Sequence, residues 1–473
     1  MGMANELQQR INRCLNVDGA FDYKLRPVVI GGKRGILCYL VGYTDALATE
    51  RCLSALLRIT EEEMASLSSM EELLERYLPL ASAEVCPTAE RAAGEILRGS
   101  MSLVLEGFEQ ILLADVRLFP VRSPNEPEKD RTLRGPHTGL GESMVSSLVQ
   151  IRRHLRTGDM RTERYLVGKK YPNEVCLLSL EGRADKALLE RIRDRLRNAK
   201  VAGLAMTQES LANLLFPMKG LRLFNPFPRV RYTERPDVIA AALMEGKVVL
   251  LCDNSPSALL LPETVYDFFE QTDDYYFPPL TASYLRCVRF LVFLTSIYLI
   301  PIWLLAVRNA ARLPSSLSAL LADGDYTVPL FLQFLLIEFA IDGLKMASLN
   351  TPSTLAGSFS VIGGLLLGEY AVKSGWFLPQ TILYSAFTSI ANFIPTNYEL
   401  SYSFKFMRIS LILLVEFFGN IGLVAGTVLW LLILASTRTV AEKGYLYPFL
   451  PFHPKGIKKI FFRSLHGKEE SSE

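Results

Sequence analysis

The order of hydrophobic and polar positions separates a mixed first part of the chain from a very apolar last third. Before Val288, apolar residues alternate with charged ones at helical or strand spacing, as in water-soluble domains. From Val288 to Ala435 there are long uncharged stretches, four of which hold 18, 21, 25 and 21 residues: Phe290–Val307, Ser348–Gly368, Ser374–Tyr398 and Phe417–Thr437. A helix needs about 20 mostly apolar residues to cross the hydrocarbon of a bilayer. We therefore predict a helical membrane domain in this part of the chain.

The mixed part begins with a pattern of helices and strands that predicts one small α/β subdomain over residues 1–120. Helical spacing marks Glu6–Leu15, Asp45–Ile59, Glu61–Leu80 and Thr88–Leu97. Strand patterns mark Pro27–Ile30, Gly35–Gly42, Met101–Leu105 and Gln110–Leu113. The basic, glycine-rich run 31–35 lacks the spacing of a phosphate-binding loop, so we interpret it as a tight turn between two strands.

A charged, proline-rich stretch without periodicity, residues 121–134, predicts an exposed linker to a second α/β subdomain, residues 135–280. The elements expected there are helices at Glu142–Leu155, Lys186–Leu196 and Val238–Met244, and strands at Val175–Leu180, Val248–Asp253 and Leu259–Leu261. Pro262 is expected to open a further helix from its first turn. The membrane domain follows over residues 281–440 and a basic tail over 441–473. The predicted fold class is an α/β soluble N-terminal region of two subdomains followed by an α-helical multi-pass membrane domain.

Composition excludes several classes of function. The net charge of +2, without a dense basic run before the tail, indicates no nucleic-acid partner. Seven cysteines stand far apart without a CxxC pair, which favours buried free thiols over disulfides or a zinc site. The four histidines form no metalloprotease motif, so we expect neither an enzyme nor a bound metal or cofactor. The polar N-terminus has no signal-peptide core, so the soluble region is expected to be cytoplasmic.

The charge of the tail constrains the number of membrane crossings. Its basic residues are Lys455, Lys458, Lys459, Arg463 and Lys468. Because cytoplasmic segments near membrane ends are rich in Lys and Arg, both ends of the chain are expected on one side, and the number of crossings should be even. The apolar segments number five, so one of them should not cross. Val328–Ala347 is the exception, because its uncharged part, Tyr326–Ile337, holds only 12 residues.

That exceptional segment carries three charges at helical spacing. Glu338, Asp342 and Lys345 share one helical face, so we expect a re-entrant or interfacial helix beside about four spans. Ionisable residues at membrane depth usually face a cavity, a partner or a pathway. Two interpretations stay open: the three residues are a pore or gating site, or they form an internal salt bridge that only anchors the helix.

Other polar and small residues of the block are further candidates. The GxxxG motifs Gly364–Gly368 and Gly422–Gly426 predict close helix packing. Glu369 with Lys373, and Glu416 with Asn420, lie one helical turn apart and could either satisfy each other or take part in conduction. The candidate pore or gating residues are therefore Glu338, Asp342, Lys345, Glu369, Glu416 and Asn420.

Several short runs together resemble the A-subunit family of GerA-type spore germinant receptors. They are Leu133–Pro136 with Gly139–Glu142, Ile151–Arg153, Arg231–Asp237, Glu245–Lys247, Asp253–Pro256, Asp273–Tyr276, Arg286 with Arg289, and Tyr445–Pro451. The resemblance extends from about Leu112 to Pro451, which is most of the chain. Within the family, Asn225–Pro228, Pro301–Trp303 and Pro395–Leu400 resemble the stage V sporulation AF branch most.

The resemblance implies a multi-pass protein of the spore inner membrane that acts in germination. It implies a homo-oligomer, a pentamer, that forms a cation-conducting channel and releases monovalent ions. The partners it implies are B- and C-type receptor subunits or, for the AF branch, a small membrane protein, besides the lipid bilayer. An alternative is a non-conducting receptor or scaffold subunit that relays a signal to partner membrane proteins. A transporter is disfavoured, because four or five spans without an inverted repeat fit that class poorly.

The family motif Thr233–Asp237 is expected at the junction between the soluble and membrane domains. Thr233 can cap a helix whose first turn contains Glu234 and Pro236. Arg235 and Asp237 are expected to form an ion pair or hydrogen bonds across that junction. The motif then has either a structural role or a direct role in signalling.

Overall fold

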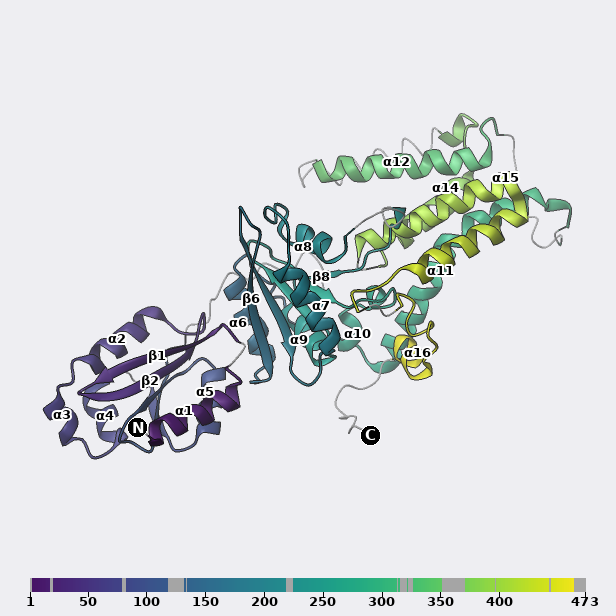
Figure 1. Ribbon diagram of the computed structural model, residues 1–473. Coiled ribbons are helices and arrows are strands. Elements are labelled where there is room, and N and C mark those ends of the chain that lie inside the picture. Colours follow the sequence, from purple (N-terminus) through teal and green to yellow (C-terminus); the bar gives the residue numbers. More distant parts are fainter. Residues whose placement is uncertain are drawn as a thin grey trace. The chain divides into compact units, whose positions relative to one another are not determined.

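A computed structural model shows two compact units (Figure 1). It describes residues 2–17, 20–78, 82–117, 132, 134–217, 224–312, 314, 321, 326–350, 371–395, 397–441 and 444–462. Unit 1 consists of Met1–Met218 and Val230–Pro262, and unit 2 consists of Lys219–Arg229 and Glu263–Glu473. The division thus falls at Pro262 rather than near residue 280, and a short segment before Val230 belongs to unit 2.

Unit 1 contains two five-stranded antiparallel sheets, which bears out the α/β prediction for this region. The first sheet has the order β1-β2-β4-β5-β3. Its strands are β1 (Tyr23–Ile30), β2 (Lys33–Leu40), β3 (Ala83–Cys86), β4 (Met101–Leu105) and β5 (Ile111–Ala114). Its helices are α1 (Gly2–Leu15), α2 (Ala46–Leu57), α3 (Glu61–Ser66), α4 (Met70–Tyr77) and α5 (Ala89–Leu97).

Helices cover both faces of this first sheet. Leu103 and Leu105 of β4 belong to a buried cluster with residues of α2, α3 and α4, whereas Val104 between them belongs to a cluster with residues of α1 and α5. Successive side chains of a strand point to opposite faces, so all five residues of β4 are buried. The continuous apolar run of this strand therefore reflects a sheet with two covered faces.

The glycine-rich run 31–35 forms the tight turn that the sequence predicts. Ile30 pairs with Lys33 across a two-residue loop, and Gly31 and Gly32 both have positive φ, 49° and 77°. This combination is the type I′ geometry, which matches the twist of a β-hairpin. The turn leaves no open phosphate cradle, because a Cβ at Gly31 would overlap Met64.

The predicted helical run Glu61–Leu80 is instead two short helices. Thr60 and Glu63 form a capping box at the start of α3. Leu67 then leaves the helical conformation, and Ser69 caps α4 by accepting a hydrogen bond from the Glu72 backbone. Ser69 supplies the cap that restarts the helix, because Ser side chains favour caps over helix interiors. The backbone and hydroxyl of Ser68 donate to the Glu72 carboxylate.

The second sheet has the order β6-β7-β9-β10-β8. Its strands are β6 (Met160–Val167), β7 (Asn173–Leu180), β8 (Arg231–Thr233), β9 (Val248–Cys252) and β10 (Ala258–Leu261). Helices α6 (Met144–His154) and α9 (Pro236–Met244) share a buried cluster with β7, β9 and β10. Helices α7 (Lys186–Arg197) and α8 (Thr207–Leu215) contact β6 and β9–β10 respectively. Of the expected linker 121–134, Thr132 is buried, and residues 121–131 and 133 lie outside the described residues.

A buried ion pair joins the two sheets of unit 1. Nε of Arg152 on α6 donates to Oδ2 of Asp22 over 2.6 Å, and Thr162 of β6 donates to the other Asp22 oxygen. Burial lowers the pKa of Arg152, but the charges of Asp22 and Tyr23 outweigh burial and hold that pKa above its ordinary value. The guanidinium therefore stays charged, and a residue of the Ile151–Arg153 motif has a structural role between the sheets.

The seven cysteines are free thiols, as predicted, but two of them are exposed. Cys38, Cys52, Cys86, Cys176 and Cys252 are buried, whereas Cys14 and Cys287 are exposed. Burial raises the pKa of the Cys38 thiol to about 12, so this group stays neutral. The prediction of buried thiols is wrong for Cys14 and Cys287, which lie on outward faces of helices.

Unit 2 is helical. Its elements are the 3-10 turn Asp267–Phe269, α10 (Asp273–Tyr276), α11 (Pro279–Arg308), the 3-10 turn Ala310–Arg312, α12 (Leu330–Asn350), α14 (Pro379–Ala391), α15 (Tyr398–Ser436) and α16 (Pro454–Phe461). The prediction that Pro262 opens a helix is wrong: an extended stretch follows β10, and the first helical turn starts at Asp267. Thr264 begins this turn: its backbone and hydroxyl donate to Oδ2 of Asp267, and its carbonyl oxygen accepts from the Asp267 backbone.

Among the described residues, two helices are long and apolar enough to cross a membrane, α11 and α15. The expected span Ser374–Tyr398 contains only the 13 residues of α14, which extend about 20 Å and fall short of a hydrocarbon core of about 30 Å. A proline begins α14 and Asn392 ends it. Most of the expected span Ser348–Gly368 lies outside the described residues. The multi-pass arrangement therefore stays a prediction.

Candidate functional site

Helix α15 is a helical hairpin with its bend at Gly419. The backbone of Gly419 is non-helical, with φ 59° and ψ −134°. Nε1 of Trp430 donates to Oγ of Ser410 over 2.7 Å, although 20 residues of straight helix would separate the two by about 30 Å. Residues 398–418 and 420–436 are therefore antiparallel arms, which we call the hairpin (Figure 1). The hairpin was missed from the sequence, where only 417–437 was taken as a span.

The second GxxxG motif lies between the two arms. A Cβ at Gly422 would overlap the carbonyl oxygen of Leu414, and one at Gly426 would lie 2.7 Å from Cδ2 of Leu411. The two glycines thus let the arms approach closely, which is the usual effect of small residues between apolar helices. Gly364 and Gly368, the first GxxxG motif, lie outside the described residues.

We expect the substitution Gly422→Ala to separate the arms and destabilise unit 2 by about 1–3 kcal/mol, as overpacking of a core does. The matched control is Gly343→Ala in α12, where a Cβ meets nothing within 4 Å and where Ala should be neutral or stabilising. The midpoint of thermal unfolding is measured for both variants as purified full chains in detergent. Equal midpoints for the two variants would contradict close packing of the hairpin.

Four charged side chains of α12 and the first arm meet inside unit 2, and we call them the buried charge quartet: Glu338, Asp342, Lys405 and Arg408. Arg408 donates to Oε1 of Glu338 from Nε over 2.8 Å and from Nη2 over 2.5 Å. Nζ of Lys405 lies 2.6 Å from Oδ2 of Asp342 and 2.9 Å from Oε2 of Glu338. Two carboxylates thus face two cations, so the quartet is neutral as a whole.

Burial differs across the quartet. The side chains of Arg408 and Glu338 are 0% and 2% exposed, whereas that of Asp342 is 25% exposed. Arg408 also donates to the Ser296 carbonyl oxygen of α11 over 3.1 Å, so the quartet connects α12, the hairpin and α11. Oδ1 of Asp342 accepts no hydrogen bond within the described structure. Oε2 of Glu338 likewise accepts no hydrogen bond there, and both oxygens are buried. Asp342 is therefore distinguished within the quartet by its partly exposed side chain, not by its buried unpaired oxygen.

The three charges that the sequence placed on one face of this helix all lie beside the first arm of the hairpin, where Nζ of Lys345 is 6.0 Å from the ring centre of Tyr402. Glu338 and Asp342 pair with the first arm of the hairpin rather than with Lys345. Nζ of Lys345 instead lies 4.7 Å from the ring centre of Phe393, as a cation–π contact. Lys405 and Arg408 are the site residues that sequence analysis missed. A signal existed, because both interrupt an otherwise apolar run and are spaced three residues apart, on one helical face.

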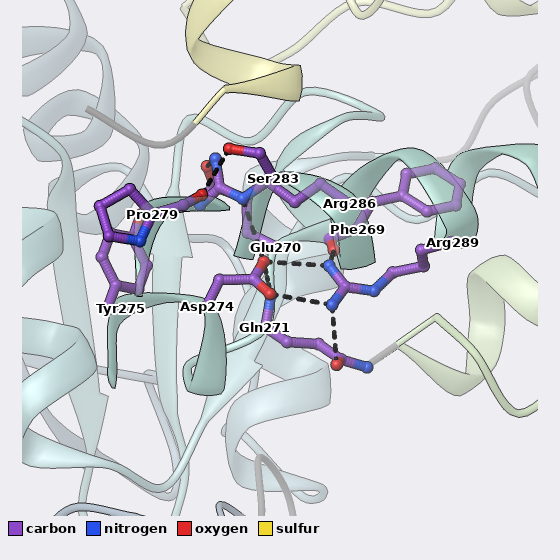
Figure 2. Close-up of polar contacts among 9 residues, drawn as sticks. All are labelled: Phe269, Glu270, Gln271, Asp274, Tyr275, Pro279, Ser283, Arg286 and Arg289. Carbon is purple, nitrogen blue, oxygen red and sulfur yellow. Dashed lines mark hydrogen bonds and ion pairs between the residues drawn. The ribbon is translucent and has the colours of Figure 1, made fainter. Parts of the chain in front are cut away.

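A second buried cluster surrounds Asp274 at the start of α11 (Figure 2). The Asp274 side chain is 1% exposed. It accepts hydrogen bonds from Arg286 Nε over 3.1 Å and from Arg289 Nη1 and Nη2 over 3.0 Å each. Arg289 also donates to the Phe269 carbonyl oxygen and to Gln271 Oε1 over 2.6 and 2.9 Å. We call these residues, with Glu270, the Asp274 cluster.

The polar ends of α11 fit the thickness of a bilayer. Arg289 in the Asp274 cluster and Arg308 at the other end are 19 residues apart, which is about 28 Å along a helix and close to a hydrocarbon core of about 30 Å. At the far end, Nη1 of Arg308 donates to the carbonyl oxygens of Val415 and Glu416, next to the bend of the hairpin. The bend and the end of α11 therefore lie at the same depth.

Glu416 and Asn420 lie on either side of this bend and are exposed. The interpretation that they form a pair one helical turn apart is wrong, because Gly419 interrupts the helix between them. Their expected role in conduction is not tested by this geometry. Glu369 lies outside the described residues.

The segment before Val230 is bound to the base of the hairpin. The ring of Phe227 lies 6.0 Å from that of Trp430 and 6.2 Å from that of Tyr445. Asn225 donates to Thr437 over 2.7 Å, and Tyr445 donates to the Pro228 carbonyl oxygen over 2.6 Å. The chain leaves unit 1 after Met218 and returns to it at Val230. Residues 224–229, which bind within unit 2 between these two points, are called the strap. Two of the runs singled out from the sequence, Asn225–Pro228 and Tyr445–Pro451, meet here.

The motif Thr233–Asp237 lies in unit 1. Arg235 and Asp237 form an ion pair with each other inside unit 1, with Nη2 2.7 Å from Oδ2, and Arg235 also donates to Thr132 over 2.6 Å. Bonds from this motif across the junction stay a prediction. Pro236 is the first residue of α9, as expected. Thr233 is not the cap of that helix: it ends β8, and its hydroxyl accepts a hydrogen bond from the Arg235 backbone. Glu234 accordingly precedes the helix instead of occupying its first turn.

The described chain thus combines an α/β region of two sheets with a helical unit that contains buried charges and two helices, α11 and the bent α15, whose length and composition suit a membrane. The chain belongs to the Bacillus/Clostridium GerA spore germination protein family, whose model matches residues 9–472. It is similar to stage V sporulation protein AF of Bacillus subtilis (strain 168), with 30% identity covering 94% of this chain and 89% of that protein.

Two further relatives have lower identity to this chain. Spore germination protein KA of Bacillus subtilis (strain 168) is 25% identical over 94% of this chain and 82% of its own length. Spore germination protein A1 of the same organism is 25% identical over 89% of this chain and 85% of its own length. The crystal structure of the N-terminal domain of the A subunit of the Bacillus megaterium spore germinant receptor GerK3 matches 54% of this chain and 92% of that chain, with 21% identity and a TM-score of 0.40. The family match and the apolar helices α11 and α15 together indicate a spore membrane protein that works with other germination receptor subunits.

Proposed function

We propose that this protein is a subunit of an oligomeric, pentameric cation channel of the spore inner membrane, which releases monovalent ions during germination and is not an enzyme. Its N-terminal region and C-terminal tail would face the cytoplasm. Its partners would be B- and C-type receptor subunits or a small membrane protein. The observation that carries the proposal is the buried charge quartet, which places four charged side chains in an otherwise apolar helical unit.

The physical argument rests on Asp342. Charged groups at membrane depth are costly and usually mark a pathway or a partner. Three members of the quartet are almost fully buried, whereas the Asp342 side chain is 25% exposed and its carboxylate is paired with Lys405 through Oδ2. Repeated once per subunit around a ring, such a carboxylate would favour cations over anions. Glu338, by contrast, is held between Arg408 and Lys405 and would support the helix that presents Asp342.

Cation flux into liposomes tests this proposal. We expect purified protein, reconstituted with a partner membrane protein, to conduct potassium above a lipid control, and Asp342→Asn to lower that flux severalfold while the oligomer persists. Glu62→Gln is the matched control, because Glu62 is an exposed carboxylate of unit 1. Flux at the level of empty liposomes, or equal flux in the two variants, would contradict the proposal.

A second candidate function, a non-conducting subunit that relays a signal, is favoured by the strap. The chain passes between the two units at residues 218–219, 229–230 and 262–263, and the strap lies between the first two of these passages. A rearrangement of unit 1 would thus pull directly on the helical unit. Phe227→Ala distinguishes the two functions: a relay predicts normal assembly but lost response to germinant, whereas a channel alone predicts unchanged flux per oligomer.

A further inference from the structure

Helix α16 (Pro454–Phe461) is strongly amphipathic. Its apolar residues Ile457, Ile460 and Phe461 follow i, i+3, i+4 spacing, and the lysine positions 455, 458 and 459 repeat that spacing on the opposite side. The three apolar side chains are half-buried, whereas Lys458 is exposed. His453 caps the helix by accepting a hydrogen bond from the Gly456 backbone over 3.0 Å, so the helix has a defined start.

The apolar face of α16 is bound to α11 at one particular level. The ring of Phe461 lies 5.4 Å from that of Phe290, edge to face at 90°. Phe290 is the first residue of the uncharged stretch of α11, and Arg289 directly before it belongs to the Asp274 cluster. Since α11 changes from charged to apolar at this point, α16 lies where the polar boundary of a bilayer would meet that helix.

The surroundings of α16 combine positive charge with exposed aromatic side chains. Between Glu442 and Glu469 the sequence contains six basic residues and no acidic one. Phe452 and Phe462, on either side of the helix, are 74% and 57% exposed. A solvated lysine face would not require exposed phenylalanines beside it. Aromatic side chains next to lysines are instead typical of segments that lie in a membrane interface.

We propose that α16 is an interfacial helix whose lysine face binds the headgroups of anionic phospholipids, with Phe452 and Phe462 inserted beside it. The occupant is a lipid surface rather than an acidic protein, because the helix is fixed at the boundary level of α11 and its flanking aromatic residues are apolar anchors. Each lysine near an anionic leaflet strengthens attraction roughly fivefold. Lipid charge would thereby hold the tail against the first span.

Amide hydrogen exchange of the full-length protein in nanodiscs tests this inference. We compare nanodiscs of phosphatidylcholine alone with nanodiscs of equal parts phosphatidylcholine and phosphatidylglycerol. Exchange in the peptide that covers α16 should be about tenfold slower or more in the anionic bilayer, since three lysines contribute. The triple variant Lys455→Gln/Lys458→Gln/Lys459→Gln should lose this difference, and high salt should weaken it in the unmodified protein.

Two variants separate loss of lipid binding from loss of the helix. The matched control Lys169→Gln/Lys170→Gln/Lys200→Gln removes three exposed lysines of unit 1 and should keep the effect of anionic lipid. The triple Lys→Arg variant at 455, 458 and 459 should keep it as well. Gln and Lys have similar helix propensity, so exchange in phosphatidylcholine should match between the glutamine variant and the unmodified protein. Equal exchange of the unmodified protein in both bilayers, or protection that survives in the glutamine variant, would overturn the inference.

Discussion

Replacing Arg408 by Gln is expected to destabilise unit 2 by about 3–5 kcal/mol, the usual result of removing one partner from a buried ion pair. The guanidinium is fully buried and donates twice to Glu338 and once to the Ser296 carbonyl oxygen. Without it, two carboxylates share the single cation of Lys405, and the quartet carries one uncompensated negative charge. Size-exclusion chromatography after heating of the detergent-purified full chain measures the resulting fall in midpoint.

A double variant shows whether the loss comes from charge imbalance. Glu338→Gln together with Arg408→Gln leaves Asp342 and Lys405 as a neutral pair, so we expect it to be more stable than Arg408→Gln alone. When two charges belong to one network, the effects of their substitutions on the free energy of unfolding are not additive. Arg156→Gln is the control, since Arg156 is exposed in unit 1. If Arg408→Gln unfolds at the same temperature as Arg156→Gln but changes the cation flux, the quartet belongs to the conduction path instead of anchoring α12.

Part of this site could be predicted from the sequence and part could not. Glu338 and Asp342 were found because a charge inside an apolar run is conspicuous when membrane depth makes it costly. Their partners were missed because Lys405 and Arg408 break the run 398–418, so that this arm did not count as a membrane segment at all. Residue spacing within one segment predicts only partners on the same helix, whereas the actual pairs connect residues more than 60 positions apart.

The fold of unit 1 was predicted better than that of unit 2. Buried strands such as β4 and β9 have continuous apolar runs that local pattern detects. Strand β6 was missed because its incompletely buried positions carry the charged residues Arg161, Glu163 and Arg164. The three-residue β8 was missed because it is too short to show a period. The hairpin was missed for a different reason. Whether a glycine bends an apolar helix depends on the contacts that the second arm makes, and these are not local.

Removing the carboxylate of Asp274 is expected to be as disruptive as removing Arg408, because one acid holds two arginines. Arg286 and Arg289 both have side chains only 7% exposed. In Asp274→Asn, Arg286 loses this close carboxylate and keeps the more distant Glu270, 3.9 Å away, while Arg289 keeps the Phe269 carbonyl oxygen and Gln271. Burying unpaired charges costs about 3–5 kcal/mol. The first turns of α11 should therefore loosen before the rest of unit 2.

Limited trypsin digestion of the full chain in detergent detects this loosening, because cleavage after Arg286 and Arg289 requires the start of α11 to open. We expect Asp274→Asn to be cleaved there much faster than the unmodified protein, and Asp273→Asn, the same change one position earlier, to be cleaved at close to the original rate. A double variant, Asp274→Asn with Arg289→Gln, should recover part of the resistance at Arg286, since only one of the two buried positive charges that Asp274 compensates then remains. Equal cleavage of Asp274→Asn and Asp273→Asn would show that the two arginines do not depend on this carboxylate. Other contacts would then have to hold the first turns of α11 in place, and with them the position of Phe290, against which α16 packs.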